Sequence, residues 1–435
     1  MEKLFVYCLI WSVGATVEER SRKDIDYILR DIESIFPHQN TIYEHYLNVE
    51  KRDWAAWEDR IPVSYKPQEK GLEFHLISVP TVDTARNKYL VNSLMKHGSQ
   101  VLLVGHTGVG KTALIDSILL GLDISISSFN ISLSAGTTSE GTQALIESNF
   151  ERRTKSKYNP KNAKKKSICF VDDLNMPRKD TYGSQPPLEL IRQWMDYNGW
   201  YNREKLTMNT IIGLQFLCAM GKPGGGRAEI SQRLMSKFHV INYTIPDDSQ
   251  MKRIYESIAA YKLQGFEEEV KNLVEPMVIS TINLFAIISE KFLPTPAKSH
   301  YVFNMRDISK VFQGMYRADK GFHDTKEQIV QLWAHEVLRV FEDRMVNVDD
   351  HKELREYIDE QMETHFQMSF EEFCLKDGED AIYVDFLNEG KRVYEEVQDF
   401  EKLRNYLVDQ LEKYNEDPKL MKMDLVLFKD AVYHI

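Results

Sequence analysis

The sequence is short of positive charge, and this shortage excludes one broad class of function. Lysine and arginine together number 55 residues, against 66 aspartate and glutamate residues, which gives a formal net charge of −11. A general nucleic-acid-binding protein needs a positive surface to contact phosphates. We therefore expect no nucleic-acid partner. The one basic run, residues 155–166, contains three consecutive lysines and is interpreted as a solvated loop.

Two other patterns are missing, namely paired cysteines and paired histidines with metal-ligand spacing. His335-Glu336 lacks the second histidine of a zinc-binding helix, so no side-chain metal ligands are assigned from this motif. The chain has only four cysteines, and none belongs to a C-x-x-C pair, which indicates ordinary buried thiols in a reducing compartment. These cysteines are Cys8, Cys169, Cys218 and Cys374.

Long hydrophobic runs are also scarce. The apolar run at residues 4–13 follows Lys3 and precedes Gly14-Ala15, which resembles a signal peptide. It is too short to span a bilayer, and a buried helix explains the same residues. We expect the buried helix, no membrane partner and a cytoplasmic location. Hydrophobic residues make up 43% of the chain, enough for two or three packed units.

The strongest positive signal is a phosphate-loop motif of the form G-x-x-x-x-G-K-[ST]. A short apolar run, residues 101–104, precedes the motif and is expected to form a buried strand, and residues 113–120 have the composition of a helix. Strand, glycine loop and helix form the context that the motif requires. The motif consists of Gly105, His106, Thr107, Gly108, Val109, Gly110, Lys111 and Thr112.

The residue types in this motif predict how it binds a nucleotide. The glycines allow successive backbone N–H groups to point inward, and the helix N-terminus adds partial positive charge. Lys111 is expected to reach the β- and γ-phosphates, and the Thr112 hydroxyl is expected to bind Mg²⁺. The sequence therefore predicts a site for ATP or ADP with Mg²⁺.

A second acidic motif completes the expected site. The apolar residues 168–171 are followed by Asp172 and Asp173. In this arrangement the first acid holds Mg²⁺, and the next acid orients or deprotonates the attacking water. A lone acid in this position is often only an acidic turn after a buried strand. A nucleotide site is favoured here because the run continues the βα alternation that follows the phosphate loop.

Hydrophobic periodicity and turn residues divide the rest of the chain into expected elements. Residues 18–60 have a helical pattern, and residues 74–80 have an extended one. Alternating helices and strands follow, which is typical of an α/β fold with a parallel sheet. They are helix 81–96, strand 124–133, helix 139–153, helix 187–197, strand 210–219, a turn at 221–227, a helix carrying Arg233, and strand 238–243.

Beyond residue 247 the pattern is helical only. Helices are expected at 249–263, 267–292, 305–318 and 325–345. Asn304 is a good N-cap, which places Arg306 in the first turn of the third of these helices. From about residue 348 the chain is acidic, amphipathic and helical, with a break at 415–418. The expected organisation is a helical lead-in (1–70), an α/β nucleotide-binding core (71–246), a helical lid (247–347) and a helical connector (348–435).

A phosphate loop among five strands, followed by a helical lid, resembles the AAA+ P-loop NTPase fold. Longer motifs narrow the resemblance to dynein heavy chains, and within them to the third AAA+ module of the axonemal motor ring. Residues 9–14 resemble the run that joins the second module to the third, and residues 423–435 resemble the lead-in to the fourth, which suggests a cut chain. The motifs are residues 79–84, 170–177, 182–187, 192–196, 219–227, 300–307 and 332–344.

This resemblance implies a role for each matching residue. Residues 105–112 match Walker A, while Asp172 and Asp173 match Walker B. Val79 and Pro80 match the loop that packs on adenine. Arg306 matches the lid arginine called sensor 2. Arg233 matches an arginine that faces the pocket of the preceding module in a ring, and Arg227 is a competitor for that role.

Two departures from the general AAA+ pattern predict slow hydrolysis. Most active members have Glu where this chain has Asp173, and Gly221 stands at the sensor 1 position, which is usually Asn. The shorter acid withdraws its carboxylate by about 1.5 Å, and misplacement of about 1 Å can cost a hundredfold in rate. Asn175 lies nearby in the sequence and is a candidate substitute for sensor 1.

The resemblance implies a regulatory nucleotide-binding module of a dynein heavy chain that contributes to ciliary, microtubule-based motility. Its partners would be the neighbouring modules, with other dynein subunits and microtubules reached only through the full motor. Its location would be the cytoplasm, the cytoskeleton and the ciliary or flagellar axoneme. Two alternatives stay open at this point, a self-standing AAA+ ATPase that forms homo-oligomers and a structural ring segment whose nucleotide does not exchange.

Overall fold

The structure is a computed structural model, and its contacts divide the chain into two compact units. The first unit comprises Met1–Val63 and Pro80–Pro246, and the second comprises Ser64–Val79 and Asp247–Ile435. The boundary expected at 70–71, and part of the extended stretch expected at 74–80, lie outside the described residues. These residues are 1–32, 35–63, 65, 73–74, 77–162, 164–376, 379–387 and 392–434.

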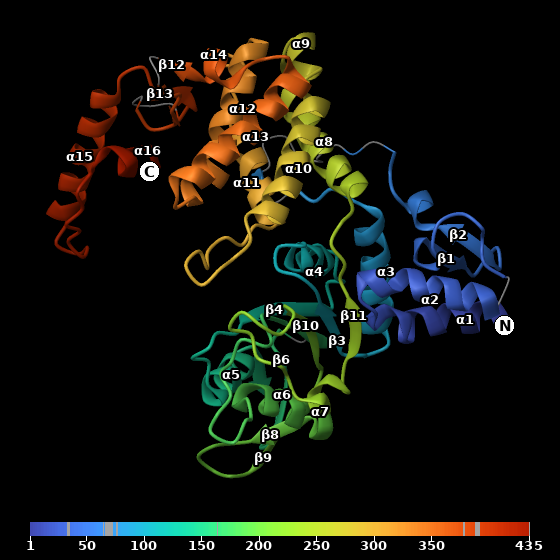
Figure 1. The fold of residues 1–435 in the computed structure, drawn as a ribbon. Helices are drawn as coiled ribbons and strands as arrows, with labels where there is room; N and C mark the ends of the chain where they lie inside the picture. The colour runs from blue at the N-terminus through green and yellow to red at the C-terminus, as the bar shows by residue number, and fades with distance from the viewer. Residues whose placement is uncertain are drawn as a thin grey trace. The chain divides into compact units, whose positions relative to one another are not determined.

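A five-stranded parallel sheet forms the centre of the first unit (Figure 1). Its order is β11-β3-β10-β7-β4, and every pairing between neighbours is parallel. The predicted α/β fold with a five-stranded parallel sheet is therefore confirmed. The strands are β3 (Val101–Val104), β4 (Ile126–Ser132), β7 (Lys166–Asp172), β10 (Leu214–Met220) and β11 (His239–Asn242).

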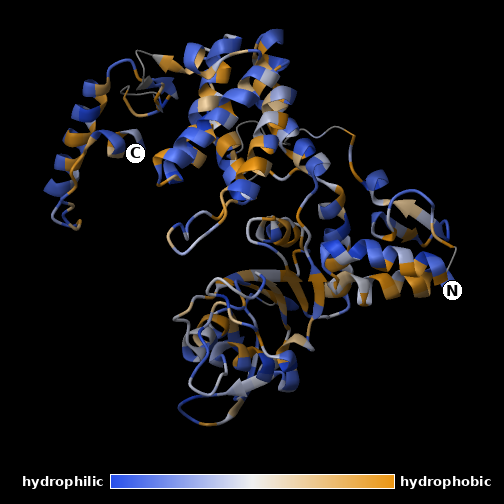
Figure 2. Cartoon of the chain, in the orientation of Figure 1, coloured by the Kyte–Doolittle hydropathy of each residue, from blue (hydrophilic) through white to orange (hydrophobic). Residues whose placement is uncertain are grey.

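Helices cover both faces of this sheet. On one face α3 (Val82–Lys96) and α4 (Lys111–Leu120) pack on alternate strand residues such as Leu103 and Phe170. On the other face α5 (Ser139–Glu147), α6 (Pro186–Tyr197) and α7 (Gln232–Met235) contribute to a second core. Figure 2 shows the central strands as mostly hydrophobic segments, as expected for a sheet buried on both faces.

A small second sheet, in the order β5-β6-β9-β8, corrects three sequence predictions. The helix expected at 139–153 ends at Glu147, the loop expected at 155–166 contains β6, and the strand expected at 210–219 is two strands. Gly213, with φ +74°, turns the chain between these two strands. The sheet comprises β5 (Phe150–Arg152), β6 (Lys157–Pro160), β8 (Gly199–Tyr201) and β9 (Met208–Ile211).

The sequence predicts a helical pattern over residues 18–60, but the structure is helical in only part of this stretch. Helices α1 (Glu2–Ser12) and α2 (Glu19–Ile32) are followed by an antiparallel hairpin of β1 (His45–Asn48) and β2 (Asp53–Ala56). The Asn48 side chain accepts hydrogen bonds from the backbone N–H groups of Glu50 and Lys51, which closes the turn. Residues 4–12 are helical in α1, which buries Val6 and Ile10 but leaves Leu4 and Phe5 exposed.

This lead-in is tied to the carboxyl end of strand β11. The Arg22 guanidinium donates to the backbone oxygen of Asn242 at 3.0 Å, and the Asn242 amide donates back to the oxygen of Val17 at 3.0 Å. Burial, with the charge of Arg86 next in importance, lowers the pKa of Arg22 to about 10. The lead-in is thus part of the same compact unit as the sheet.

The second unit is built from helices, as the sequence predicts. Asn304 caps α11 (Met305–Met315) by accepting from the N–H of Arg306 at 2.9 Å, and its own N–H donates to Asp307. By length and composition the segment Glu268–Lys291 is apolar enough to cross a membrane, and 44% of its 18-residue apolar window is buried inside the protein. The other helices are α8 (Asp248–Lys262), α9 (Glu268–Lys271), α10 (Val274–Lys291) and α12 (Lys326–Phe341).

The part from residue 348 onward is less regular than the expected helical connector. It contains α13 (Val348–Phe366), α14 (Phe370–Cys374), α15 (Phe400–Glu416) and α16 (Lys429–His434). Helix α15 ends at Glu416, which agrees with the predicted break at 415–418. Two short hairpins interrupt the helices. Their strands are β12 (Leu375–Lys376), β13 (Glu379–Asp380), β14 (Tyr383–Val384) and β15 (Glu395–Glu396).

Candidate nucleotide site

The phosphate loop joins β3 to α4, and two of its glycines are required by the backbone. A Cβ at Gly105 would lie 2.3 Å from the carbonyl oxygen of Tyr243 in the strand connection beside it. Gly110 has φ +96° and forms the left-handed N-cap of α4. Any other residue would be strained at these positions, so the loop conformation follows from the sequence.

Lys111 and Thr112 occupy the first turn of α4 and face the loop and β7. The Lys111 ammonium donates to the carbonyl oxygens of Gly105 at 2.9 Å and His106 at 2.6 Å. The Thr112 hydroxyl donates to Asp172 Oδ2 at 2.9 Å. A hydroxyl beside a carboxylate is an oxygen donor pair that suits Mg²⁺, which usually binds proteins through one or two carboxylates and the phosphates of its nucleotide. These residues fit the expected metal-nucleotide group.

His106 adds little positive charge to the phosphate loop, because its pKa is lowered. Partial burial, and next the neighbouring Lys222 ammonium, lower the pKa of His106 from its ordinary value of 6.5. The imidazole is therefore mostly neutral at pH 7, and the loop presents the Lys111 ammonium to an anionic ligand.

Asp172 is held firmly, but Asp173 is not. Asp172 Oδ1 accepts from the backbone N–H of Asp173 at 2.9 Å. Asp173 itself has φ +51°, and its side chain is 48% exposed. Aspartate tolerates the left-handed region better than most residues, because its short polar side chain can bond locally. The backbone here therefore favours Asp over the longer Glu.

Gly221, which the resemblance places at the sensor 1 position, lies near the side chains of Asn175 and Arg227. Asn175 is fully buried, and its amide donates to the Gly221 carbonyl oxygen at 2.9 Å. Asn175 is therefore engaged with the backbone and is a poor substitute for sensor 1. Also nearby is Arg227, whose guanidinium is 4.0 Å from Asp173 Oδ1. The sequence alone indicates Arg227 only as a candidate for the pocket of the preceding module.

The other predicted site residues lie at element ends. Val79 is buried and belongs to the second unit, whereas Pro80 begins the next part of the first unit. Arg306 is exposed in the first turn of α11, in the second unit. Arg233 is exposed on α7. Their roles towards adenine, phosphates and a neighbouring module stay predictions.

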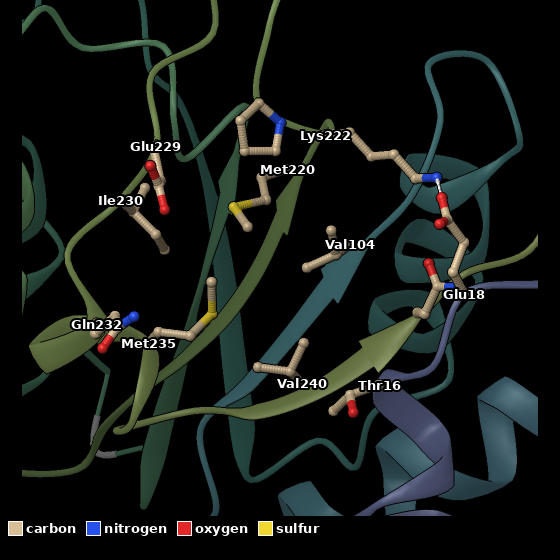
Figure 3. Close-up of a pocket in the computed structure, with 12 residues that line it drawn as sticks. Thr16, Glu18, Val104, Met220, Lys222, Glu229, Ile230, Gln232, Met235 and Val240 are labelled. Atoms are coloured by element: carbon tan, nitrogen blue, oxygen red, sulfur yellow. Dashed lines mark hydrogen bonds and ion pairs between the residues drawn. The ribbon is translucent and has the colours of Figure 1, made fainter. Parts of the chain in front are cut away.

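A cavity of about 450 Å³ lies next to the phosphate loop but does not include it. Val104 and Met220, the last residues of β3 and β10, line it together with Met235 of α7 (Figure 3). At its rim an ion pair joins Lys222 to Glu18. None of the phosphate-loop or Walker B residues lines this cavity, so the cavity and the predicted nucleotide site are separate.

Comparison with protein families gives three matches that follow one another along the chain. Residues 1–59 match the dynein heavy chain AAA lid domain, residues 66–246 match the P-loop containing dynein motor region, and residues 256–351 match the dynein heavy chain ATPase lid domain. The chain belongs to the dynein heavy chain family. Its phosphate loop and acidic strand end therefore lie in the motor region of this dynein segment.

Individual relatives align with the whole dynein segment. Dynein axonemal heavy chain 2 of Mus musculus is 46% identical over 436 residues, and the Homo sapiens protein of the same name is also 46% identical. Dynein-1-beta heavy chain, flagellar inner arm I1 complex, of Chlamydomonas reinhardtii is 40% identical over 439 residues. All of this chain is covered in each case. It spans only 10% of the length of each of these relatives.

Proposed function

We propose that this segment is a nucleotide-binding regulatory module of an axonemal dynein heavy chain. It binds ATP or ADP with Mg²⁺ and hydrolyses ATP slowly. The observation that carries this proposal is the contact of the Thr112 hydroxyl with Asp172, 2.9 Å long, directly beside the folded phosphate loop. That contact joins the two expected Mg²⁺ residues from separate elements, α4 and β7.

The proposed biological setting follows from the relatives. The names of the related proteins refer to axonemal and flagellar dyneins, which supports a location in the axoneme of a cilium or flagellum and a contribution to microtubule-based motility. The partners are the neighbouring AAA+ modules of the same heavy chain. The long motifs described above support the third position in the ring. The match of residues 1–59 to a lid domain supports a lead-in that comes from the preceding module.

The Mg²⁺ role of Asp172 can be tested by replacing its carboxylate with an amide. In Asp172→Asn, ATP binding without Mg²⁺ should change little, but the tightening caused by Mg²⁺ should fall by about tenfold, because a charged oxygen donor is lost. Calorimetric titrations with and without Mg²⁺ measure this difference. Asp180→Asn is the matched control, since the Asp180 side chain accepts from Tyr182 and Ser184 within its own surface turn. Undiminished tightening in Asp172→Asn would remove the residue from the metal site.

The two predicted arginines should behave differently in the isolated chain. Arg306→Ala should weaken ATP binding by about five- to tenfold, because this arginine comes from the chain's own lid. Arg233→Ala should change the affinity less than about twofold, because its target is a pocket of another module. Fluorescence titration with a labelled nucleotide measures both. The reverse pattern would overturn both assignments.

The homo-oligomeric alternative makes a different prediction about size. A self-standing AAA+ ATPase should assemble into a ring when ATP is added, whereas a segment of one heavy chain should stay monomeric. The match of all of this chain to about a tenth of much longer relatives favours the heavy-chain segment. Light scattering with and without ATP distinguishes the two. A hexamer that appears only with ATP would contradict the proposed role.

A further inference from the structure

The run Gly224-Gly225-Gly226 forms an ordered turn that returns the chain towards Asp173. Its three φ angles are +119°, +57° and +86°. The N–H of Gly224 donates to the oxygen of Arg227 at 3.0 Å, and the N–H of Arg227 donates back to Gly224 at 3.1 Å. Ala228 then donates to the oxygen of Asn175 at 3.0 Å. The turn therefore ties the backbone next to Arg227 to the segment that follows the Walker B strand.

Gly221 leaves the space that the Arg227 side chain occupies. A Cβ at residue 221 would lie 2.7 Å from Arg227 Nε and 2.8 Å from Arg227 Cδ, and its three nearest heavy atoms all belong to that arginine. Real Cβ atoms essentially never lie closer than 3.0 Å, so a larger residue at 221 would require the flexible Arg227 side chain to move from this position. The Arg227 side chain can therefore take this position because residue 221 has no side chain.

Two unpaired polar atoms lie beside Gly221. Among the described residues, Arg227 Nε and Asn175 Oδ1 are buried and have no hydrogen-bond partner. One is a donor and the other an acceptor, and Asn175 is already bonded to the Gly221 oxygen. A buried polar pair of this kind has a strong preference for a nearby partner or a bridging water. The Arg227 side chain is only 26% exposed, and its Nη2 lies 4.0 Å from Asp173 Oδ1.

We propose that Arg227 is a positioning residue of this chain's own site, where its guanidinium takes the sensor 1 place and orients the Asp173 carboxylate. The predicted effect on the hydrolysis rate rests on the proposed nucleotide function. The contact between Arg227 and Asp173 does not. The contact pair is Arg227 Nη2 and Asp173 Oδ1, 4.0 Å apart. Arg233, which is exposed on α7, is left as the arginine available to a neighbouring module.

A stability cycle without nucleotide tests the contact. Gly221→Ala should lower the melting temperature of the α/β unit by about 2–4 °C, because the added methyl displaces the Arg227 side chain from its position. The same change in an Arg227→Ala background should lower it by less than half as much, since the clash is gone. Scanning calorimetry of the four proteins measures this coupling. Equal losses in both backgrounds would overturn the proposed packing.

Single-turnover hydrolysis tests the positioning role, in a heavy-chain segment that includes both neighbouring modules. Arg227→Ala should lower the rate about threefold, as much as Asp173→Asn, and the double variant should be no slower. Arg227→Lys should recover part of the loss, because it keeps the charge without the planar fork. Arg153→Ala, which removes an arginine paired with Glu151 on the small sheet, is the control.

The remaining outcomes separate this inference from the proposed function. An unchanged or faster rate in Arg227→Ala, or an effect confined to the preceding module's nucleotide, would overturn the inference. ADP affinity should change less than about threefold in Arg227→Ala, because the residue acts on the water-orienting acid rather than on the diphosphate. If the wild-type protein binds no nucleotide, the proposed function fails, while the stability cycle still decides whether Arg227 and Gly221 are coupled.

Discussion

Replacing Lys111 with alanine should weaken the binding of both ATP and ADP by about 100-fold or more, because the loop loses its cation at the phosphates. In the structure the Lys111 ammonium bonds to the carbonyl oxygens of Gly105 and His106, so it lies along the inner side of the loop that would bind phosphate. The lowered pKa of His106 keeps that side chain from replacing the charge. Isothermal calorimetry on the isolated chain measures the loss.

A control must show that the Lys111 variant is still folded. Lys237→Ala removes a lysine of the same unit that pairs with Asp196 before β11 begins, at the amino end of the sheet. This variant should bind nucleotide as the wild type does. Lys111→Ala should keep a melting temperature within a few degrees of the wild type, since the lysine bonds to the loop carbonyl oxygens of Gly105 and His106. Equal nucleotide affinity in the Lys111 variant and the wild type would refute the nucleotide site.

The parts of the fold predicted correctly from the sequence are those with a local cause. The phosphate loop needs glycine at residue 110 because its backbone is left-handed, with φ +96°. The start of α11 needs Asn304 because its side chain satisfies a free N–H of the first turn. The long amphipathic helices of the second unit and the alternating strands of the central sheet also repeat their pattern over enough residues to be recognised.

The parts predicted wrongly are short strands that are stabilised by pairing with a partner strand. Strand β6 is parallel to β9, with Lys157 opposite Thr210, and neither strand is longer than four residues. A basic four-residue strand has no periodicity that separates it from a loop. The same reason explains the missed hairpin of β1 and β2. Short strands are stabilised by their partners, and the sequence of one strand says little about which partner it finds.

The choice between Arg227 and Arg233 could not be made from the sequence either. Both arginines follow β10 within a short stretch, and their spacing fits either role. The position of the Arg227 side chain depends on the space left by Gly221. That information is three-dimensional, so the sequence supports two candidates, and the assignment of Arg227 to this chain's own site is a proposal that rests on the structure.

The largest gain in rate is expected from lengthening the Walker B acid. The Asp173 side chain is 48% exposed, and the proposed positioning contact with Arg227 Nη2 is long, at 4.0 Å. If its short reach limits catalysis, Asp173→Glu should raise the single-turnover rate of ATP hydrolysis by about 10- to 100-fold. Asp173→Asn should lower the wild-type rate only modestly. The measurement requires a heavy-chain segment with both neighbouring modules, so that any arginine from a neighbour is present.

Two controls separate the effect of side-chain length from other effects of the Asp173→Glu change. Asp173→Gln has the length of Glu without its charge, so it should not raise the rate. Glutamate in a left-handed backbone costs about 1–2 kcal/mol, so Asp173→Glu should melt a few degrees below the wild type. A stability loss together with a faster rate would show that the backbone at residue 173 favours Asp at the expense of catalysis. A wild-type rate at or above about 1 s⁻¹, with a large loss in Asp173→Asn, would instead make Asp173 a competent catalytic residue and contradict the slow regulatory module.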